Sequence, residues 1–368
     1  MTYKELIYFT GRCLALDEYP KFRERVIEQF QARGTDLENF VQLCSDHLII
    51  PAIYLQLKAH NLLTYLPEEY IQALKEIYDL NCKRNRQILK QIDAITAVLN
   101  QENIQPVFLK GTANLLDGVY SDLGERMIGD IDFLVKEDEY LKAAYLLEAQ
   151  GYSNTRTRYF DVFRFKHYPS LAKSDEPVAV EIHRMVFEKK FSRGFDTGLI
   201  FSQKKTLPGK EDLFVPSDEH KLIHTFIHSQ IADHGHSLHV AHFRGLNDLY
   251  KLSKRIDVSL LARQTGYPHE ANSWLAIGQR LMGLQGLCLN ETRLVRWYCR
   301  KYDWSLCHVR TFHAYNILKK IVYTVFMRYG LGLVQMIYSS EQRTSAYKRL
   351  KDPEWYKIHF SSVMESFQ

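Results

Sequence analysis

Two aspartates separated by one residue stand at the start of an apolar run near the middle of the chain. Asp130 and Asp132 alternate with Ile131 and Phe133. In an extended strand, side chains at positions i and i+2 point to the same face, so both carboxylates should project together while the two apolar side chains enter a core. Carboxylates with Cα atoms about 6–7 Å apart repel each other unless a cation lies between them. We therefore expect a divalent cation with oxygen ligands, Mg²⁺ or Mn²⁺, which leaves positions free for phosphate groups.

A third acid lies in a second strand-like run. Glu181 stands within the sequence Val-Ala-Val-Glu-Ile-His at residues 178–183, and a charged residue with apolar neighbours should face a site rather than a core. A site for two metal ions uses such a carboxylate from a neighbouring strand. We predict Asp130, Asp132 and Glu181 as the metal-binding and catalytic acids. His183 faces the same side as Glu181, where it either orients that acid, contacts a nucleotide or packs.

The segment Lys110-Gly111-Thr112 has the composition of a phosphate-binding turn. It follows the short apolar run 107–109 and precedes a helical pattern. A glycine lets the backbone approach a phosphate, which the threonine hydroxyl and the free N–H groups at a helix start can bind. Lys110 and Arg126 would neutralise further phosphate charge. The predicted nucleotide-binding residues are Lys110, Gly111, Thr112, Arg126 and His183.

Each of these motifs is weak by itself, because an isolated Asp-x-Asp is more often a solvated strand end or a turn. Their order along the chain is more specific. Gly111-Thr112 followed by Asp130-Ile131-Asp132 resembles the signature of the DNA polymerase β-like nucleotidyltransferase superfamily. That signature has a glycine followed by Gly or Ser after a strand, and then Asp-x-Asp. Thr112 departs from it but keeps a hydroxyl.

A closer resemblance covers about residues 106–187. The residues that carry it are Leu109-Lys110-Gly111, Tyr120, Arg126, Asp130-Ile131-Asp132-Phe133-Leu134-Val135, Gly151-Tyr152 and Glu181-Ile182-His183. They resemble bacterial nucleotidyltransferases whose substrate is unassigned. The resemblance implies that the three acids form the carboxylate triad and that Gly111-Thr112 is the phosphate loop. It implies an NTP donor, with ATP expected, and an acceptor hydroxyl on a small molecule, a protein or an RNA. The hydroxyl would attack the α-phosphate in line, and pyrophosphate would leave.

Seven of the 15 histidines lie between residues 220 and 242. His220, His224 and His228 are spaced to share one helix face. Such a face either chelates Zn²⁺ or, as we favour, carries neutral imidazoles beside an active-site cleft. His224, His228 and Arg244 are candidates for an acceptor pocket. Arg244 is also spaced to pair with Asp248 on one helix.

The surrounding patterns predict the elements that position these residues. The hydrophobic pattern predicts helices over residues 1–100. Over residues 106–187 it predicts the order strand, helix, strand, helix, strand, strand. The last two strands, 159–167 and 177–186, are expected to form a hairpin. The pattern is helical again after Ser217, which is the expected N-cap of a helix. We predict an α+β protein with a small mixed sheet at 101–215, an N-terminal helical region at 1–100 and a C-terminal helical region at 216–368.

The composition limits the classes of partner. A net charge of +5 suits an anionic ligand such as a nucleotide but indicates no clear DNA-binding surface. The six cysteines lack the spacing of a disulfide framework or a zinc ribbon. The first residues lack the apolar region of a secretory signal. The most apolar stretch, 321–338, contains an arginine and two glycines and reads as a buried core helix. We therefore expect a cytoplasmic protein with no membrane partner.

Two other classes of function remain as alternatives. One is a catalytically inactive nucleotidyltransferase fold that serves as a binding module, although three intact acids argue against it. The other is a metallohydrolase built on the histidines of residues 220–242. Tightly bound Zn²⁺ or Fe would favour the metallohydrolase, whereas weak dependence on Mg²⁺ would favour the transferase.

Overall fold

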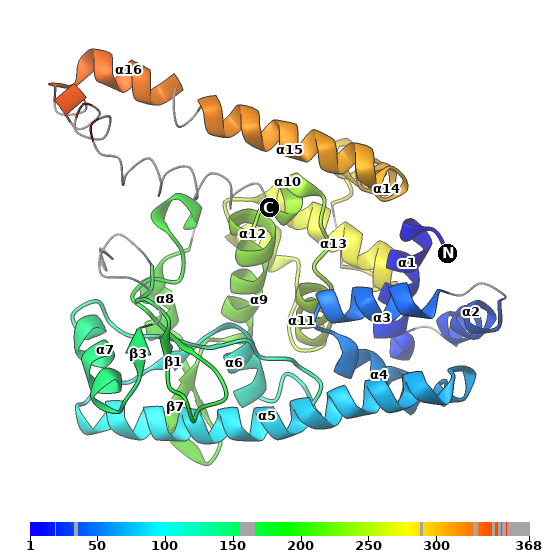
Figure 1. The fold of residues 1–368 in the computed structure, drawn as a ribbon, viewed down its shortest axis with the longest axis horizontal. Coiled ribbons are helices and arrows are strands. Elements are labelled where there is room, and N and C mark those ends of the chain that lie inside the picture. The colour runs from blue at the N-terminus through cyan, green and yellow to red at the C-terminus, as the bar shows by residue number, and fades with distance from the viewer. Residues whose placement is uncertain are drawn as a thin grey trace. The chain divides into compact units, whose positions relative to one another are not determined.

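The computed structural model describes residues 1–18, 20–32, 36–154, 166–193, 195–287, 290–326, 330–340, 343–344, 347 and 351. The chain divides into two compact units, Met1–Tyr302 and Asp303–Gln368 (Figure 1). The first unit contains the sheet and every residue predicted above to take part in a site.

The N-terminal region is helical, as its pattern predicts. Its α-helices are α1 (Tyr3–Leu14), α2 (Pro20–Gln31), α3 (Leu37–Asp46), α4 (Ile50–Ala59) and α5 (Glu68–Gln101), with short 3-10 turns η1 (Leu16–Glu18) and η2 (Leu63–Tyr65). Helix α1 begins with a capping box between Thr2 and Glu5, which satisfies two backbone N–H groups. Helix α5 starts after Pro67 and runs for 34 residues. It packs against α4 near its start and against the sheet near its end (Figure 1).

Within the described residues, a mixed sheet of seven strands follows, with the order β3-β4-β5-β2-β1-β7-β6. Its strands are β1 (Val107–Phe108), β2 (Ile131–Leu134), β3 (Ser153–Asn154), β4 (Leu171–Ala172), β5 (Val180–His183), β6 (Lys205–Leu207) and β7 (Lys210–Val215). Strand β2 pairs antiparallel with β1 and parallel with β5, and β1 pairs parallel with β7. This sheet among helices confirms the predicted α+β class.

The alternation of side chains along β2 and β5 separates a core face from a polar face. Ile131, Phe133, Val180 and Ile182 are fully buried in one cluster with side chains of α5 and α7 (Tyr140–Ala149). The intervening residues, which include the acids of both strands, therefore point to the opposite face. Helix α6 (Lys110–Leu116) and α9 (Asp218–Phe226) pack against each other beside this opposite face.

The region between β2 and α9 agrees only in part with the predicted pattern. Most of the predicted strand 159–167 lies outside the described residues, although His167 forms an antiparallel bridge with His183. Strand β5 falls within the predicted run 177–186. The hairpin of β6 and β7 has no counterpart in the prediction, because the first three residues of β7 are exposed and polar. Between these strands lie η3 (Lys189–Phe191) and α8 (Thr197–Ser202).

Helices complete the first unit after residue 216. They are α9, the π-helix η4 (Ile227–Ala232), α10 (Gly235–Leu238), α11 (Phe243–Ser253), α12 (Leu260–Gln264) and α13 (Pro268–Met282), and α14 (Arg293–Cys307) continues into the second unit. Ser217 is the N-cap of α9, as predicted, and its hydroxyl accepts a hydrogen bond from the backbone N–H of His220 at 3.3 Å.

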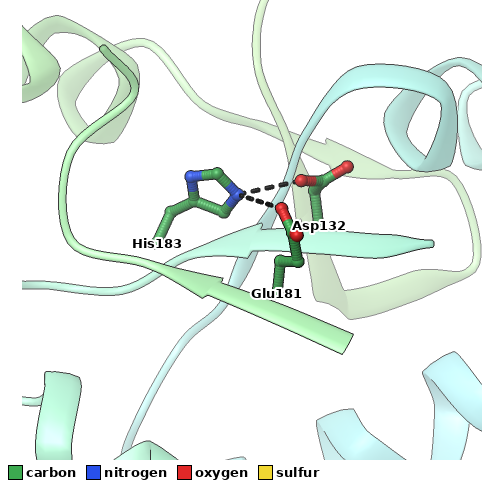
Figure 2. A group of neighbouring side chains, drawn as sticks. All are labelled: Asp132, Glu181 and His183. Carbon is green, nitrogen blue, oxygen red and sulfur yellow. Dashed lines mark hydrogen bonds and ion pairs between the residues drawn. The ribbon is translucent and has the colours of Figure 1, made fainter. Parts of the chain in front are cut away.

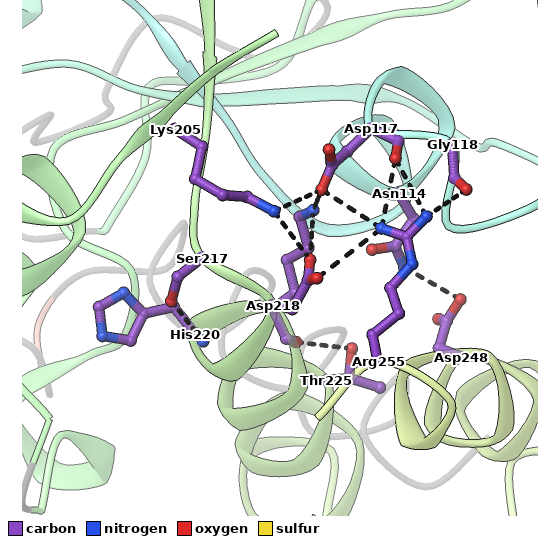
Figure 3. Close-up of polar contacts among 11 residues, drawn as sticks. Asn114, Asp117, Gly118, Lys205, Ser217, Asp218, His220, Thr225, Asp248 and Arg255 are labelled. Carbon is purple, nitrogen blue, oxygen red and sulfur yellow. Dashed lines mark hydrogen bonds and ion pairs between the residues drawn. The ribbon is translucent and has the colours of Figure 1, made fainter. Parts of the chain in front are cut away.

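A charge cluster around the buried ammonium of Lys221 joins α6, β6 and α9 (Figure 3). The ammonium of Lys221, almost fully buried, pairs with Asp117 and lies 3.0 Å from Asp218. Lys205 contacts the same two carboxylates at 2.8 and 3.1 Å. Arg255 follows α11 and donates to the backbone carbonyls of residues 117 and 118. These contacts fix the helices after residue 216 to the sheet.

The second unit contains α15 (Val309–Val325) and α16 (Leu331–Tyr338). The prediction of a buried core helix over 321–338 is wrong for the side chains described there. Phe326, Leu333 and Ile337 are 61%, 61% and 69% exposed, and the stretch is divided between two helices. Among the helices described, none combines the length and apolar character that crossing a membrane requires.

Candidate active site

Asp132 and Glu181 face each other across the parallel pair β2 and β5, where they are register partners (Figure 2). The Oδ1 atom of Asp132 lies 2.6 Å from Lys110 Nζ and 2.8 Å from His183 Nε2. The Oε2 atom of Glu181 lies 3.7 Å from the same histidine nitrogen and 3.9 Å from the same ammonium. One ligand atom from each of Asp132, Glu181 and His183 lies within 4.8 Å of the others, so this group could hold a metal ion.

Lys110 and the neighbouring imidazoles keep both of these acids ionised. Burial by itself raises the pKa of Asp132, but Lys110 and the hydrogen bond to His183 lower it below its ordinary value. The pKa of Glu181 is also lowered, because His183, His167 and Lys110 outweigh burial and repulsion by Asp132. Burial lowers the pKa of Lys110, yet the nearby carboxylates raise it overall. Asp132 and Glu181 are therefore charged at neutral pH.

Asp130 differs from the other two acids. It precedes β2, lines the same cavity as Asp132 and forms no ion pair within the described part of the chain. Burial and repulsion by Asp132 raise its pKa to about 6, although Lys110 acts in the opposite direction. A cation bound beside Asp130 would remove this electrostatic cost.

The raised pKa predicts that Asp130→Asn stabilises the metal-free protein at high pH. A carboxyl whose folded pKa exceeds its unfolded pKa stabilises the fold fully below the unfolded value, and this stability is lost as pH rises through about 6. The asparagine stays neutral, so we expect a gain of about 1–2 kcal/mol in free energy of unfolding at pH 8. Urea unfolding in EDTA at pH 8 and pH 4 measures this gain in free energy of unfolding.

The gain should disappear at pH 4, where the aspartate is protonated in the fold. The exposed Asp212 on β7 provides a control, and Asp212→Asn should change stability equally at both pH values. An Asp130→Asn protein that is less stable than the wild type at pH 8 would contradict the pKa assignment.

The β1–α6 junction places Lys110 and Gly111 at the cavity. Lys110 has a backbone φ of +50°, in the left-handed region that costs a non-glycine residue roughly 1–2 kcal/mol. Its ion pair with Asp132 offsets this cost. A Cβ atom at Gly111 would lie 3.0 Å from Ile128 and 3.5 Å from the guanidinium of Arg126. A side chain there would crowd the loop that carries Arg126.

Thr112 and His183 are both buried beneath the cavity. The Thr112 hydroxyl donates to the backbone carbonyl of Asp130 at 3.2 Å, so it joins α6 to the start of β2. His183 has no exposed surface and contacts the two acids of β2 and β5. Neither side chain lines the cavity. Their predicted contact with a nucleotide therefore stays a prediction. Their contacts within the protein help to position the three acids, because Thr112 binds the backbone of Asp130 and His183 contacts Asp132 and Glu181.

Arg126 lines the cavity, but two of the three nitrogens of its guanidinium form hydrogen bonds with Asp248. Its Nε and Nη2 atoms donate to the two carboxylate oxygens at 2.9 and 2.8 Å. Asp248 also accepts hydrogen bonds from Tyr120 at 2.6 Å and Asn114 at 3.1 Å. The pairing of Arg244 with Asp248 that their spacing suggested does not form, because Arg126 reaches both oxygens from the loop before β2.

Polar residues of α5 hold this loop in place, and the sequence pattern did not identify them. Asn85 donates to the backbone carbonyls of Leu123 and Arg126 at 2.7 and 2.9 Å. Asn81 donates to that of Gly124 at 2.7 Å, and Arg84 to that of Ile128. Because these bonds satisfy buried carbonyls, α5 fixes the backbone that leads into Asp130.

A cavity of about 280 Å³ is lined by Asp130 and Asp132, whereas Glu181 contacts Lys110 and His183 but does not line it. Residues from the β1–α6 junction and the loop before β2 form one part of its lining. A second part, from α9, η4, α11 and the residues between η4 and α11, which we call the far wall, consists of His224, Thr225, His228, Ser229, Asp233, His242, Arg244 and Gly245. The turn between α3 and α4 also contributes Asp46, His47 and Leu48.

Only two of the three histidines predicted to share a helix face are neighbours: the rings of His224 in α9 and His228 in the π-helix η4 have centroids 6.2 Å apart. His220 packs edge-on against Phe195 and does not line the cavity, whereas His224 and His228 do. His228 Nδ1 lies 2.8 Å from Asp233 Oδ2. Within the described ranges, no three ligands from this histidine-rich segment come together as a metal site. The metallohydrolase alternative therefore gains no support from the geometry.

The chain combines an α+β fold with a group of side chains that could hold a metal ion. The family described as uncharacterised nucleotidyltransferase matches residues 33–266. The match covers more than half of the chain, so the chain belongs to this family, which supports nucleotidyl transfer as its function. The resemblance found in the sequence is thereby confirmed. No curated protein shows a significant match to the chain.

Proposed function

We propose that the protein is a metal-dependent nucleotidyltransferase that transfers a nucleoside monophosphate from an NTP, with ATP expected, to an acceptor hydroxyl. The observation that carries this proposal is the pairing of Asp132 with Glu181 across two parallel strands, with Asp130 beside the same cavity. Membership of a nucleotidyltransferase family supports the same reaction.

The donor atoms fit a divalent cation. Carboxylate oxygens from Asp130, Asp132 and Glu181 are the ligands that Mg²⁺ and Mn²⁺ prefer, and these three acids would hold the metal. When bound, a divalent ion supplies positive charge for the triphosphate and lowers the pKa of the attacking hydroxyl. Lys110 now neutralises Asp132, so it competes with a metal for that carboxylate and is the nearest ammonium for a phosphate oxygen.

The far wall of the cavity offers a base for the acceptor. Because Asp233 holds the Nδ1 side of His228, a neutral imidazole with its proton on Nδ1 leaves Nε2 to accept a proton. In the proposed step the acceptor oxygen loses its proton to His228 Nε2 and forms a bond to the α-phosphorus. The bond from that phosphorus to the bridging oxygen breaks, and pyrophosphate leaves with the electron pair.

We expect His228→Gln to lower the rate of transfer by about 10²–10⁴-fold, because glutamine cannot accept the proton. Nucleotide binding, measured by titration calorimetry, should stay within about twofold of the wild type. The exposed His313 on α15 gives a matched control, and His313→Gln should leave the rate unchanged. A His228→Gln enzyme with the wild-type rate would remove this residue from the mechanism.

Labelled nucleotides test the proposed reaction directly. Wild-type and Asp130→Asn proteins are incubated with Mg²⁺ and with NTP labelled at the α- or the γ-phosphate, together with small-molecule, RNA and protein fractions as acceptors. Nucleotidyl transfer places the α-label in a new product and releases the γ-label as pyrophosphate, and the variant should do neither. Transfer of the γ-label to an acceptor would instead identify a kinase-type reaction and refute the proposal.

A further inference from the structure

Among the described residues that line the cavity, one arginine has no ionic partner. The other charged groups include Lys110, which pairs with Asp132, Arg126, which pairs with Asp248, and Asp233, which contacts His228. Arg244, in the first turn of α11, makes no ion pair or hydrogen bond with the residues that the structure describes. Arginine stays charged in proteins, and an unpaired charge that is largely removed from water is costly. An anion bound at Arg244 would offset that cost.

His224 provides a second, independent indication of a ligand at the far wall. Its side chain lines the cavity, is 2% exposed, and neither ring nitrogen has a hydrogen-bond partner among the described residues. Burial and the nearby charge of Lys110 lower the pKa of His224 well below its ordinary value, so the ring is neutral. A neutral imidazole offers one donor and one acceptor, and buried groups of this kind normally have partners.

Arg244 lies in the same cavity as two of the proposed metal-binding acids and the proposed base His228. The charges of Arg126, Asp248 and Asp130 all act on its guanidinium. His242, one residue before α11, is in turn affected by Arg244, Asp233 and His228. Arg244 therefore lies within electrostatic range of Asp130, and it lines the same cavity as Asp130, His228 and Asp233. A group held by Arg244 would lie in the cavity that Asp130, Asp132 and the proposed base share.

We propose that the far wall binds a small acceptor that carries a phosphate or carboxylate group held by Arg244 and a hydroxyl directed at His228. This inference rests on the proposed nucleotidyl transfer, since it names the class of acceptor for that reaction. The triphosphate takes the other part of the cavity, at Lys110 and the carboxylates. Arg244 suits the anion because its planar guanidinium can donate two parallel hydrogen bonds to one phosphate or carboxylate.

Calorimetric titration of two simple anions tests the proposal without knowledge of the acceptor. Inorganic phosphate and acetate are titrated separately into the full chain, with and without saturating Mg²⁺ and the α,β-methylene analogue of ATP. We expect at least one anion to bind in both conditions and to bind at least tenfold more weakly to Arg244→Gln. Arg263→Gln, at an exposed arginine of α12, is the matched control and should bind as the wild type does.

Each other outcome has a definite meaning. Binding that depends on Arg244 but is abolished by the nucleotide analogue would assign Arg244 to the donor and overturn the acceptor assignment. Anion binding that is absent, or unchanged in Arg244→Gln, would also overturn it. If Arg244→Gln does not fold, Arg244→Lys keeps the charge, loses the two-pronged geometry and should still weaken binding. Failure of the analogue to bind the wild type would exclude ATP as the donor, and anion binding without the analogue would still decide the role of Arg244.

Discussion

Replacing Asp132 with asparagine is expected to lower the rate of nucleotidyl transfer by about 10³-fold or more. The substitution removes the carboxylate that lies between the ammonium of Lys110 and the imidazole of His183, and with it a ligand of the proposed metal site. A factor of 10³ corresponds to about 4 kcal/mol of transition-state stabilisation. Pyrophosphate release from NTP in the presence of Mg²⁺ measures the rate.

The same substitution should also destabilise the metal-free protein, in contrast to Asp130→Asn. The pKa of Asp132 is lowered in the fold, so its charge stabilises the fold above its ordinary pKa, and this stability is lost as pH falls. We expect a loss of about 1–3 kcal/mol in free energy of unfolding at pH 8, because Lys110 loses its partner but keeps contact with water.

The two variants together separate catalysis from folding. Both should be inactive, but Asp130→Asn should be more stable than the wild type at pH 8 and Asp132→Asn less stable. Asp212→Asn again serves as the control and should keep both activity and stability. A folded Asp132→Asn protein that retains the wild-type rate would exclude this carboxylate from the active site.

Replacing Asp248 with asparagine is expected to have the largest effect on stability. Arg126 and Asp248 are both buried, with side-chain exposures of 9% and 4%, and two hydrogen bonds join them. Removing one partner of such a pair leaves a buried charge without compensation and typically costs about 3–5 kcal/mol. Tyr120 and Asn114 would also lose a charged acceptor. Urea unfolding monitored by circular dichroism measures the loss.

A double variant checks the cause of that loss. Arg126→Met with Asp248→Leu removes both charges, so it should be more stable than Asp248→Asn alone if the uncompensated guanidinium is responsible. Asp79→Asn, which breaks the exposed pair of Lys75 and Asp79, should change stability little. A loss below about 1 kcal/mol in Asp248→Asn would show that Arg126 finds another partner or reaches water.

The strands that carry the acids could be predicted because their local patterns are strong. In β2 the aspartate alternates with buried apolar residues, and Glu181 stands in a similar run in β5. The parallel pairing that sets Asp132 opposite Glu181 is a property of the sheet, which the sequence indicated only through the resemblance.

Contacts between distant segments could not be predicted in this way. Arg126 and Asp248 are 122 residues apart, so the near neighbour Arg244 looked like the partner of Asp248. Asn81 and Asn85 read as ordinary polar positions on a long helix, although they bind the loop before β2. Helical spacing was misleading at the histidines, because His220 packs against Phe195, whereas His224 and His228 have ring centroids 6.2 Å apart and both line the cavity.

The apolar segment near the end of the chain shows a different limit. Hydrophobic residues over 321–338 predicted burial, yet several of them are exposed in the second unit. Periodicity and composition report that a face is apolar, but they do not report what covers it.

The central claim, a metal-dependent nucleotide site at Asp130, Asp132 and Glu181, is tested most directly by thermal unfolding with each of the four NTPs. The measurement is made with and without Mg²⁺ on the wild type and on Asp130→Asn, which should remain folded. A ligand at 100 times its dissociation constant stabilises the fold by about 2.7 kcal/mol. We predict that at least one NTP raises the melting temperature of the wild type only when Mg²⁺ is present, and that Asp130→Asn loses this shift. An unchanged melting temperature with every NTP, or an equal shift in both proteins, would contradict the account.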